Sequence, residues 1–169
     1  MSGSSSAADP RRSPTTAAAE RVLRLAAALL ALAHGAWIWW LSSQSFPGGG
    51  SPFWGFLSNS LHFFLFGGLA LLLAEACRRA GGWSRDALLG VLVLTGTYGI
   101  VDEWHQAWTP GRQPDAFDVC VDLLGALAAL SLWWGVRGPG RLRPAVVRFL
   151  SIGLCAAALN AARTWGPLR

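Results

Sequence analysis

The chain has 169 residues, of which 53% are hydrophobic and only 14% are charged, and it contains 10 tryptophans. Soluble domains carry roughly 25% charged residues, so this composition excludes an ordinary soluble domain and indicates a membrane protein. The formal net charge of +5 comes from arginines, because the chain contains no lysine. These arginines flank apolar segments, which makes phospholipid headgroups their expected partners and argues against a nucleic-acid-binding protein.

The first twenty residues, MSGSSSAADPRRSPTTAAAE, are rich in serine and alanine and have too few large apolar side chains to build a core. We expect residues 1–20 to be a disordered cytoplasmic tail. The apolar run that follows, from Val22 to Leu41, is longer than the hydrophobic region of a secretory signal. It is therefore expected to be an uncleaved first membrane span.

Three more segments have about the length needed to cross roughly 30 Å of hydrocarbon. They run from Leu57 to Cys77, from Ala87 to Trp108 and from Phe117 to Val136. Leucine, alanine and glycine dominate these segments, and a span must satisfy its backbone hydrogen bonds internally, so both features favour helices. The sequence therefore predicts an all-α integral membrane bundle of four transmembrane helices, with residues 21–136 as its membrane domain.

Residues 137–169 form a basic segment with a weaker apolar stretch from Pro144 to Ala162. Arg148 and Asn160 limit its uninterrupted apolar core to about eleven residues, which is short for a span. This stretch is either a fifth transmembrane helix or an interfacial helix, and both interpretations stay open on the sequence alone.

The arginines also predict the orientation of the chain. They precede the first span, fill the connection between spans two and three, and follow span four, whereas the other two connections carry few charges. Because cytoplasmic loops are enriched in basic residues, the arginine-rich sides are expected to be cytoplasmic. The sequence thus predicts a multi-pass plasma-membrane protein with a cytoplasmic N-terminus and the lipid bilayer as its partner.

This topology gathers polar residues of four spans near the outer leaflet. Asp118 and Asp122 share one helix face, because residues three or four apart lie on the same side of a helix, and the small residues Gly125 and Ala129 continue that face. A charge at the bilayer centre costs at least ~2.5 kcal/mol, so we expect either a functional site or polar contacts that hold the helices together. The gathered residues are Ser42, Ser43, Gln44, Asn59, His62, Asp102, Glu103, His105, Gln106, Asp118 and Asp122.

The loop TPGRQPDAFD connects spans three and four. Pro110 fixes φ and Gly111 permits a positive φ, which predicts a tight turn that brings Arg112 toward the polar residues. Either Asp115 or Asp118 can then cap the fourth helix or pair with Arg112.

The order LSSQS, a His-Phe pair, YGIVDEWHQAWTPGR and DVCVDLLGA resembles the VanZ-like family, named for a membrane protein associated with teicoplanin resistance. The resemblance extends from Leu41 to about Leu130, and its most specific part is DE-x-HQ followed by PGR and D-x-x-D. The chain departs from the family pattern at Asn59 and Ser60, where an acidic and a basic residue are usual, and at Asp122, where asparagine is usual. The family-like positions are Ser42, Ser43, Gln44, His62, Tyr98, Gly99, Asp102, Glu103, His105, Gln106, Pro110, Gly111, Arg112, Asp115, Asp118 and Gly125.

From the resemblance and the polar residues together, we expect an outward-facing site that interacts with cell-envelope material and contributes to glycopeptide resistance. Its ligand is expected to be a lipid-linked cell-wall precursor or the glycopeptide itself. The binding candidates are Ser43, Gln44, Gln106, Arg112, Asp115, Asp118 and Asp122. A transporter is disfavoured, because the inner halves of the spans, such as GGLALLLA, contain no polar residues for a solute path.

The alternative is a membrane-embedded enzyme that acts on a lipid-linked envelope precursor. His62 or His105 would be the general base, and an acid, Asp102 or Glu103, would orient it. A metal-assisted variant would use the same four residues as ligands, but the D-E-x-H-Q spacing is not HExxH or another established ligand spacing. The sequence therefore predicts no metal centre, leaves the cofactor unknown, and does not decide whether the protein is an enzyme.

Overall fold

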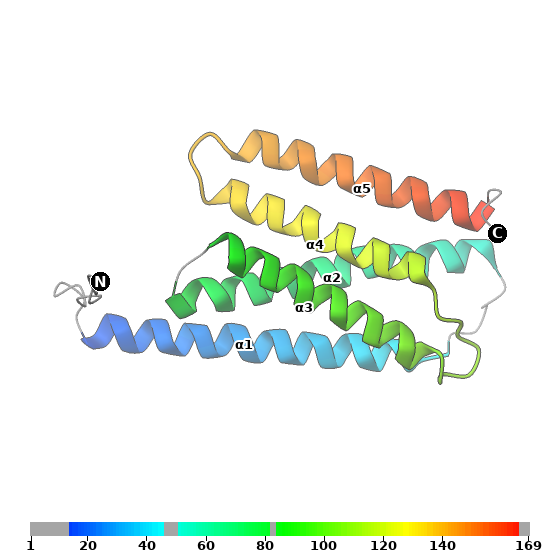
Figure 1. Ribbon diagram of the computed structural model, residues 1–169, viewed down its shortest axis with the longest axis horizontal. Coiled ribbons are helices and arrows are strands. Elements are labelled where there is room, and N and C mark those ends of the chain that lie inside the picture. The colour runs from blue at the N-terminus through cyan, green and yellow to red at the C-terminus, as the bar shows by residue number, and fades with distance from the viewer. Residues whose placement is uncertain (1–13, 46–50, 82–83, 166–169) are drawn as a thin grey trace, which may run out of the picture.

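The computed structural model describes residues 14–45, 51–81 and 84–165. Within these ranges the chain forms five α-helices and no strand: α1 (Pro14–Ser42), α2 (Pro52–Gly81), α3 (Arg85–Gln106), α4 (Ala116–Val136) and α5 (Leu142–Trp165). Figure 1 shows the helices lying lengthwise side by side, each reversing the direction of the one before. The prediction of an all-α bundle is confirmed.

All five helices are long and apolar enough to cross a membrane. The uncertain fifth stretch is the 24-residue helix Leu142–Trp165, which is about as apolar as the other four helices. Its length at about 1.5 Å per residue is sufficient for a bilayer. Of the two interpretations, the structure therefore favours the one with a fifth span.

The beginning of α1 corrects the boundary of the predicted tail. The helix starts at Pro14, so residues 14–20 are helical, although the sequence analysis assigned them to a disordered segment. Proline suits the first position of a helix, and the alanines that follow are strong helix formers. Residues 1–13, to which the rest of that prediction applies, lie outside the described residues.

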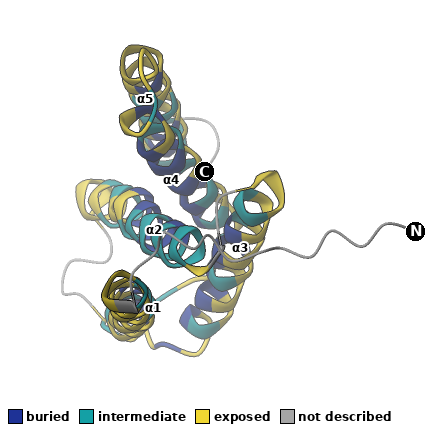
Figure 2. Cartoon of the chain, turned by 90° about the vertical axis from the view of Figure 1, so that its left-hand side faces the viewer, coloured by how far each residue is buried: buried dark blue, intermediate teal, exposed yellow. Residues whose placement is uncertain are grey.

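The centre of the bundle is the close contact between α2 and α4. A Cβ atom added at Gly125 would collide with the carbonyl oxygen of Phe63, and one added at Gly67 would lie 3.0 Å from the carbonyl oxygen of Gly125. Glycine at both positions therefore lets the two backbones approach closely. Figure 2 shows α1 and α5 as the outer helices, on opposite sides of the group formed by α2, α3 and α4.

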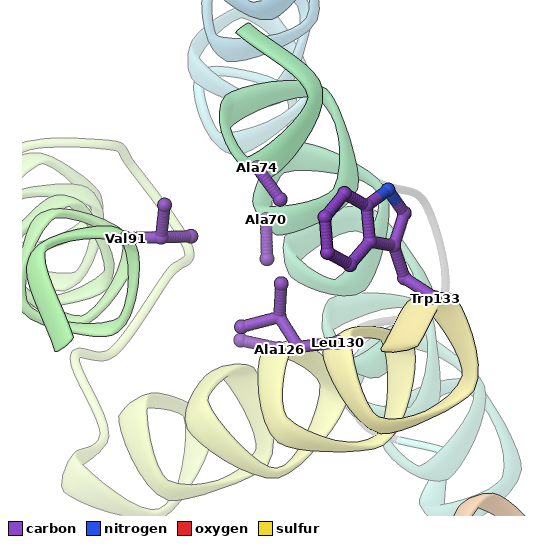
Figure 3. Packing of buried hydrophobic residues seen from close by; sticks show 6 residues of the cluster. All are labelled: Ala70, Ala74, Val91, Ala126, Leu130 and Trp133. Carbon is purple, nitrogen blue, oxygen red and sulfur yellow. The ribbon is translucent and has the colours of Figure 1, made fainter. Parts of the chain in front are cut away.

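The largest buried apolar cluster joins these three central helices (Figure 3). Its members are three alanines, a valine, a leucine and a tryptophan: Ala70, Ala74, Val91, Ala126, Leu130 and Trp133. Many large apolar side chains on the outer helices point outward instead; Leu32 on α1 and Leu154 on α5 are 71% and 72% exposed. This distribution suits a bundle whose outer surface contacts lipid tails, because lipid offers no penalty for exposed leucine.

Alternating helix directions give the bundle two different ends. At one end, Glu75 forms ion pairs with Arg78 at 2.7 Å, with Arg79 at 2.7 Å and with Arg137 at 3.0 Å. At the other end, α1, α3 and α5 finish and α2 and α4 begin (Figure 1, right). This second end collects the polar residues that the sequence singled out.

Candidate functional site

Almost all buried polar side chains of the described residues lie at this second end. The one exception is Thr95, in the middle of α3. The others come from all five helices and the loop after α3: Ser42, His62, Asp102, Glu103, Gln106, Thr109, Asp118, Asp122 and Asn160. So many buried hydrogen-bonding groups require partners within the protein, because lipid supplies none.

The contact between α1 and α3 uses one face of α3. The hydroxyl of Ser42 donates to the carboxylate of Asp102 at 2.6 Å. One turn further along α3, His105 Nε2 lies 2.9 Å from the hydroxyl of Ser43, and the imidazole stacks on Trp39 with 3.7 Å between ring centroids. His105 is thus held against the end of α1.

Gln106 connects two carboxylates on α3. Its side-chain amide donates to Asp102 at 3.1 Å and to Glu103 at 2.9 Å. The other oxygen of Glu103 accepts a hydrogen bond of 2.6 Å from the backbone N–H of Asp115, the residue that caps α4. These bonds fix the rotamers of both acids and join α3 to the start of α4.

The middle of the site lies between α2, α3 and α4. His62 Nδ1 lies 3.0 Å from one oxygen of Asp122. Three buried residues, His62, Glu103 and Asp118, each have one potential ligand atom here, and these three atoms lie within 4.8 Å of one another. A histidine surrounded by acids in this way can exchange protons or bind a cation.

The loop after α3 forms the predicted tight turn. The N–H of Arg112 donates to the carbonyl of Thr109 at 3.1 Å, and Gly111 has φ = 80°, as expected for a type II turn with proline at its second position. Asp115, not Asp118, caps α4 by accepting from the N–H of Phe117 at 2.9 Å. Asp118 belongs to the first turn of the helix and is buried.

Arg112 connects the turn to the end of α1. Its guanidinium donates to the carbonyls of Gln44 at 3.2 Å and Leu41 at 3.4 Å. Cationic side chains at the last carbonyls of a helix also interact favourably with its dipole. The structure thus gives Arg112 a role in anchoring α1, in addition to its electrostatic interaction with Asp118.

Helix α5 supplies two residues that the sequence analysis did not assign to the site. Arg163 forms an ion pair with Asp115 and lies 3.9 Å from Asp118. The amide of Asn160 donates to the Phe56 carbonyl at 2.9 Å and to the Ser60 hydroxyl at 3.0 Å. The sequence feature that could have revealed both residues is their spacing, because polar residues three apart share one face of an otherwise apolar helix.

Among the proposed site residues, six come together: His62, Asp102, Glu103, Gln106, Asp118 and Asp122. His105 is separated from the middle of the site by its contacts with α1. The Gln44 amide donates back to the carbonyl of Trp40 at 3.0 Å, and Ser43 is exposed. His62 is therefore better placed than His105 to act as a general base on this geometry.

An apolar groove leads along the bundle to this end. It has a volume of about 270 Å³ and lies between α2, α4 and α5, where Phe63, Phe149 and Leu154 are among its lining residues. Asn160 and Ser60 form its polar side. Asn160 also lines a second, much smaller pocket, together with Asn59, Asp118 and Arg163. The groove and the acidic residues are thus connected through α5.

Comparison with known proteins found a family match. The VanZ/LLP1 family model matches residues 5–137, which include α1 to α4 and every polar site residue from Ser42 to Asp122. Curated proteins and solved structures gave no match. Since the family model matches well over half of the sequence, the chain belongs to the VanZ/LLP1 family.

Proposed function

We propose that the protein binds a lipid-linked precursor of the cell envelope at the outer leaflet of the plasma membrane. The hydrocarbon chain of the precursor occupies the groove between α2, α4 and α5, and its polar head meets the acidic residues. The observation that supports this most directly is Asn160, which lines both the apolar groove and the polar pocket beside Asp118 and Arg163.

The groove suits a hydrocarbon chain for two reasons. Its walls are mostly aromatic and aliphatic side chains, and the helices that form it are long and apolar enough to be membrane spans. In a bilayer, the open side of such a groove faces lipid tails, so a chain can enter without crossing water. The polar side of the groove at Ser60 and Asn160 then favours a molecule with a polar head.

The polar head would meet groups of both signs. Arg112 and Arg163 are the arginines at this end of the described chain, and guanidinium groups suit phosphate or carboxylate. The buried acids and the amide of Gln106 can accept from or donate to hydroxyl and amide groups. A molecule that combines a phosphate with sugars or a peptide would use both sets.

The expected orientation connects this binding to antibiotic resistance. Arginines gather at the opposite end, where Arg78, Arg79 and Arg137 surround Glu75, and the positive-inside rule assigns that end to the cytoplasm. The N-terminus is then cytoplasmic and the polar site faces outward. A protein that holds a precursor there would compete with a glycopeptide for it, which is how the proposed binding contributes to resistance.

A second candidate function, acid–base catalysis on the same precursor, is favoured by the contact between His62 and Asp122. An acid that hydrogen-bonds a histidine fixes its tautomer and stabilises its protonated form, which prepares it for proton transfer. Both candidates use one site. They differ in whether the precursor is chemically altered before it is released.

The test is precursor binding by the full chain in lipid nanodiscs. Native mass spectrometry would measure retention of an isoprenoid-pyrophosphate-linked disaccharide peptide in competition with bilayer phospholipid. We expect Ala157→Trp, which fills the groove, to reduce retention at least tenfold, whereas Ala158→Trp on the same turn of α5 should not. Equal retention by the two variants would contradict the groove as the binding site.

Two further measurements separate the alternatives. Binding of teicoplanin without binding of the precursor would identify the glycopeptide as the ligand and refute the proposal in its present form. A change in the mass of the precursor with time, absent in His62→Gln, would show catalysis.

A further inference from the structure

We propose that His62, Glu103 and Asp118 form a binding site for one divalent transition-metal cation. The proposal goes beyond the binding of a precursor and does not depend on it. It also departs from the prediction made from the sequence, in which no metal centre was expected and a metal-assisted variant would have used His62, His105, Asp102 and Glu103 as ligands.

The separations within this group suit a metal site. One ligand atom from each residue lies within 4.8 Å of the other two. Two ligands bound to the same zinc ion at 2.0–2.2 Å are at most roughly 4.4 Å apart, so small side-chain adjustments would complete the site. Each residue comes from a different helix, α2, α3 or α4, and no ligand spacing in the sequence could reveal them.

Asp122 orients the histidine as the outer-shell acid of a metal site does. Its contact with Nδ1 of His62, at 3.0 Å, leaves Nε2 as the nitrogen for a cation. Metal-binding histidines almost always have such a partner on the other ring nitrogen, because it fixes the tautomer and raises the basicity of the ligand. The carboxylate of Asp122 itself is fully buried, and space for it exists because residue 99 is glycine.

The second carboxylate oxygen of Asp122 provides an independent observation that favours a cation. Asp122 Oδ2 is buried and has no hydrogen-bond partner among the described residues. Asp122 lies close enough to Glu103 and Asp118 to interact with both electrostatically. An unsatisfied buried carboxylate oxygen is costly, and a cation with its bound water beside the group would remove that cost.

The balance of charges favours a cation as well. Four carboxyl groups, of Asp102, Glu103, Asp118 and Asp122, are between 0% and 6% exposed at this end. Arg163 lies 3.9 Å from Asp118 and also pairs with Asp115, and Arg112 interacts with Asp118 electrostatically, so the acids outnumber the arginines beside them. Buried charges are normally paired or bound to metals, and a divalent ion would neutralise two of these carboxylates directly.

The ligand set selects the kind of metal. One imidazole nitrogen and two carboxylate oxygens suit Zn²⁺, Mn²⁺ or Fe²⁺, whereas Mg²⁺ and Ca²⁺ prefer oxygen ligands alone. Three protein ligands leave a coordination position open for water or for a phosphate oxygen of a bound molecule. The site would therefore bind a ligand through its metal.

The experiment uses the full chain in detergent, stripped with a chelator and then titrated with Zn²⁺, Mn²⁺ or Mg²⁺. We expect about one Zn²⁺ or Mn²⁺ per chain by elemental analysis. We also expect these ions to raise the unfolding temperature, which Mg²⁺ at the same concentration should not do. Asp118→Asn should abolish both effects, and Asp122→Asn should weaken affinity about 10–100-fold. His34→Gln is the matched control, since His34 bonds the Leu65 carbonyl and is not one of the three clustered residues, so metal binding should be unchanged.

Spectroscopy on the unmodified chain covers the case in which these variants do not fold. Mn²⁺ bound to protein with ¹⁵N-labelled histidine should show hyperfine coupling to one histidine nitrogen. Stoichiometric metal without that coupling, or no retained metal after chelator treatment and titration, would overturn the proposal. Either result would leave the precursor-binding assay unaffected, so the two proposals fail separately.

Discussion

Gly99 on α3 faces the carboxylate of Asp122 on α4 so closely that a Cβ atom at residue 99 would lie 2.6 Å from Asp122 Oδ2. The missing side chain of one helix therefore makes room for the acid of another. We expect Gly99→Ala to displace Asp122, weaken its contact with His62 and lower the free energy of unfolding by about 1–3 kcal/mol, as overpacking typically does. Unfolding in detergent, monitored as the loss of the helical signal, would measure this change in stability.

Gly90, on the same helix, provides the control for that substitution. A Cβ atom there would meet no atom within 4 Å, so Gly90→Ala should be neutral or stabilise the helix by up to about 1 kcal/mol. Equal stability of the two alanine variants would show that the space beside Asp122 is not needed.

The ion pairs of Arg163 should determine how firmly α5 is attached at the polar end. Arg163→Gln removes the cation from Asp115 and Asp118, and since its side chain is 32% exposed we expect a loss of only about 1 kcal/mol of stability. Arg163→Lys keeps the positive charge, so it should lose less stability than Arg163→Gln. The exposed Arg148, nearer the start of α5, is the control, because Arg148→Gln should change little. A similar loss for both glutamine variants would indicate a general effect of removing charge.

The two histidines at the polar end should differ in their effect on function. His105→Gln can keep the hydrogen bond to Ser43, so we expect normal abundance and an unchanged envelope phenotype, measured as resistance of the cells to a glycopeptide. His62→Gln places an amide, which cannot titrate near neutral pH, beside Asp122 and should abolish the phenotype. Glycopeptide susceptibility, measured together with membrane abundance, compares them. Loss of the phenotype in His105→Gln at normal abundance would instead assign the chemistry to His105.

Replacing His105 with leucine tests its structural contribution. His105→Leu removes the interhelical hydrogen bond to Ser43 and should lower the stability by roughly 1 kcal/mol. Stability of His105→Leu equal to that of the unaltered chain would mean that the hydrogen bond to Ser43 makes no net contribution to stability.

The orientation can be tested with single cysteines. The free cysteines Cys77, Cys120 and Cys155 would first be replaced by alanine. We expect a membrane-impermeant maleimide to label Gln113→Cys, in the exposed connection before α4, in intact cells. Pro139→Cys, between α4 and α5, should react only after permeabilisation. The reverse pattern would place the acidic site in the cytoplasm and contradict the proposed function.

The helices could be predicted from the sequence because crossing a bilayer requires long apolar segments, and four such segments are evident. The fifth was left open because Arg148 and Asn160 both counted as interruptions, whereas in the bundle the amide of Asn160 is satisfied by Phe56 and Ser60. Hydropathy treats every polar residue as exposed to lipid. It therefore underestimates helices whose polar side chains have partners inside the protein.

The gathering of acids could likewise be predicted, because in helices of alternating direction the end of one span lies beside the beginning of the next. The rotation of each helix could not. His105 and Glu103 are only two residues apart, yet one faces α1 and the other faces α2 and α4. The place of His62 beside Asp122 depends on Gly99 and on the close crossing of α2 and α4, which only the three-dimensional packing reveals.

The contribution of α5 to the acidic end also fixes when that end becomes complete during biosynthesis. Of the five helices, α5 is the last to leave the ribosome, so the first four can enter the membrane before Arg163 exists. During this interval Asp115 and Asp118 lack the arginine that later pairs with them. A nascent chain halted after α4 would therefore contain the whole segment that matches the family and still have an unfinished site.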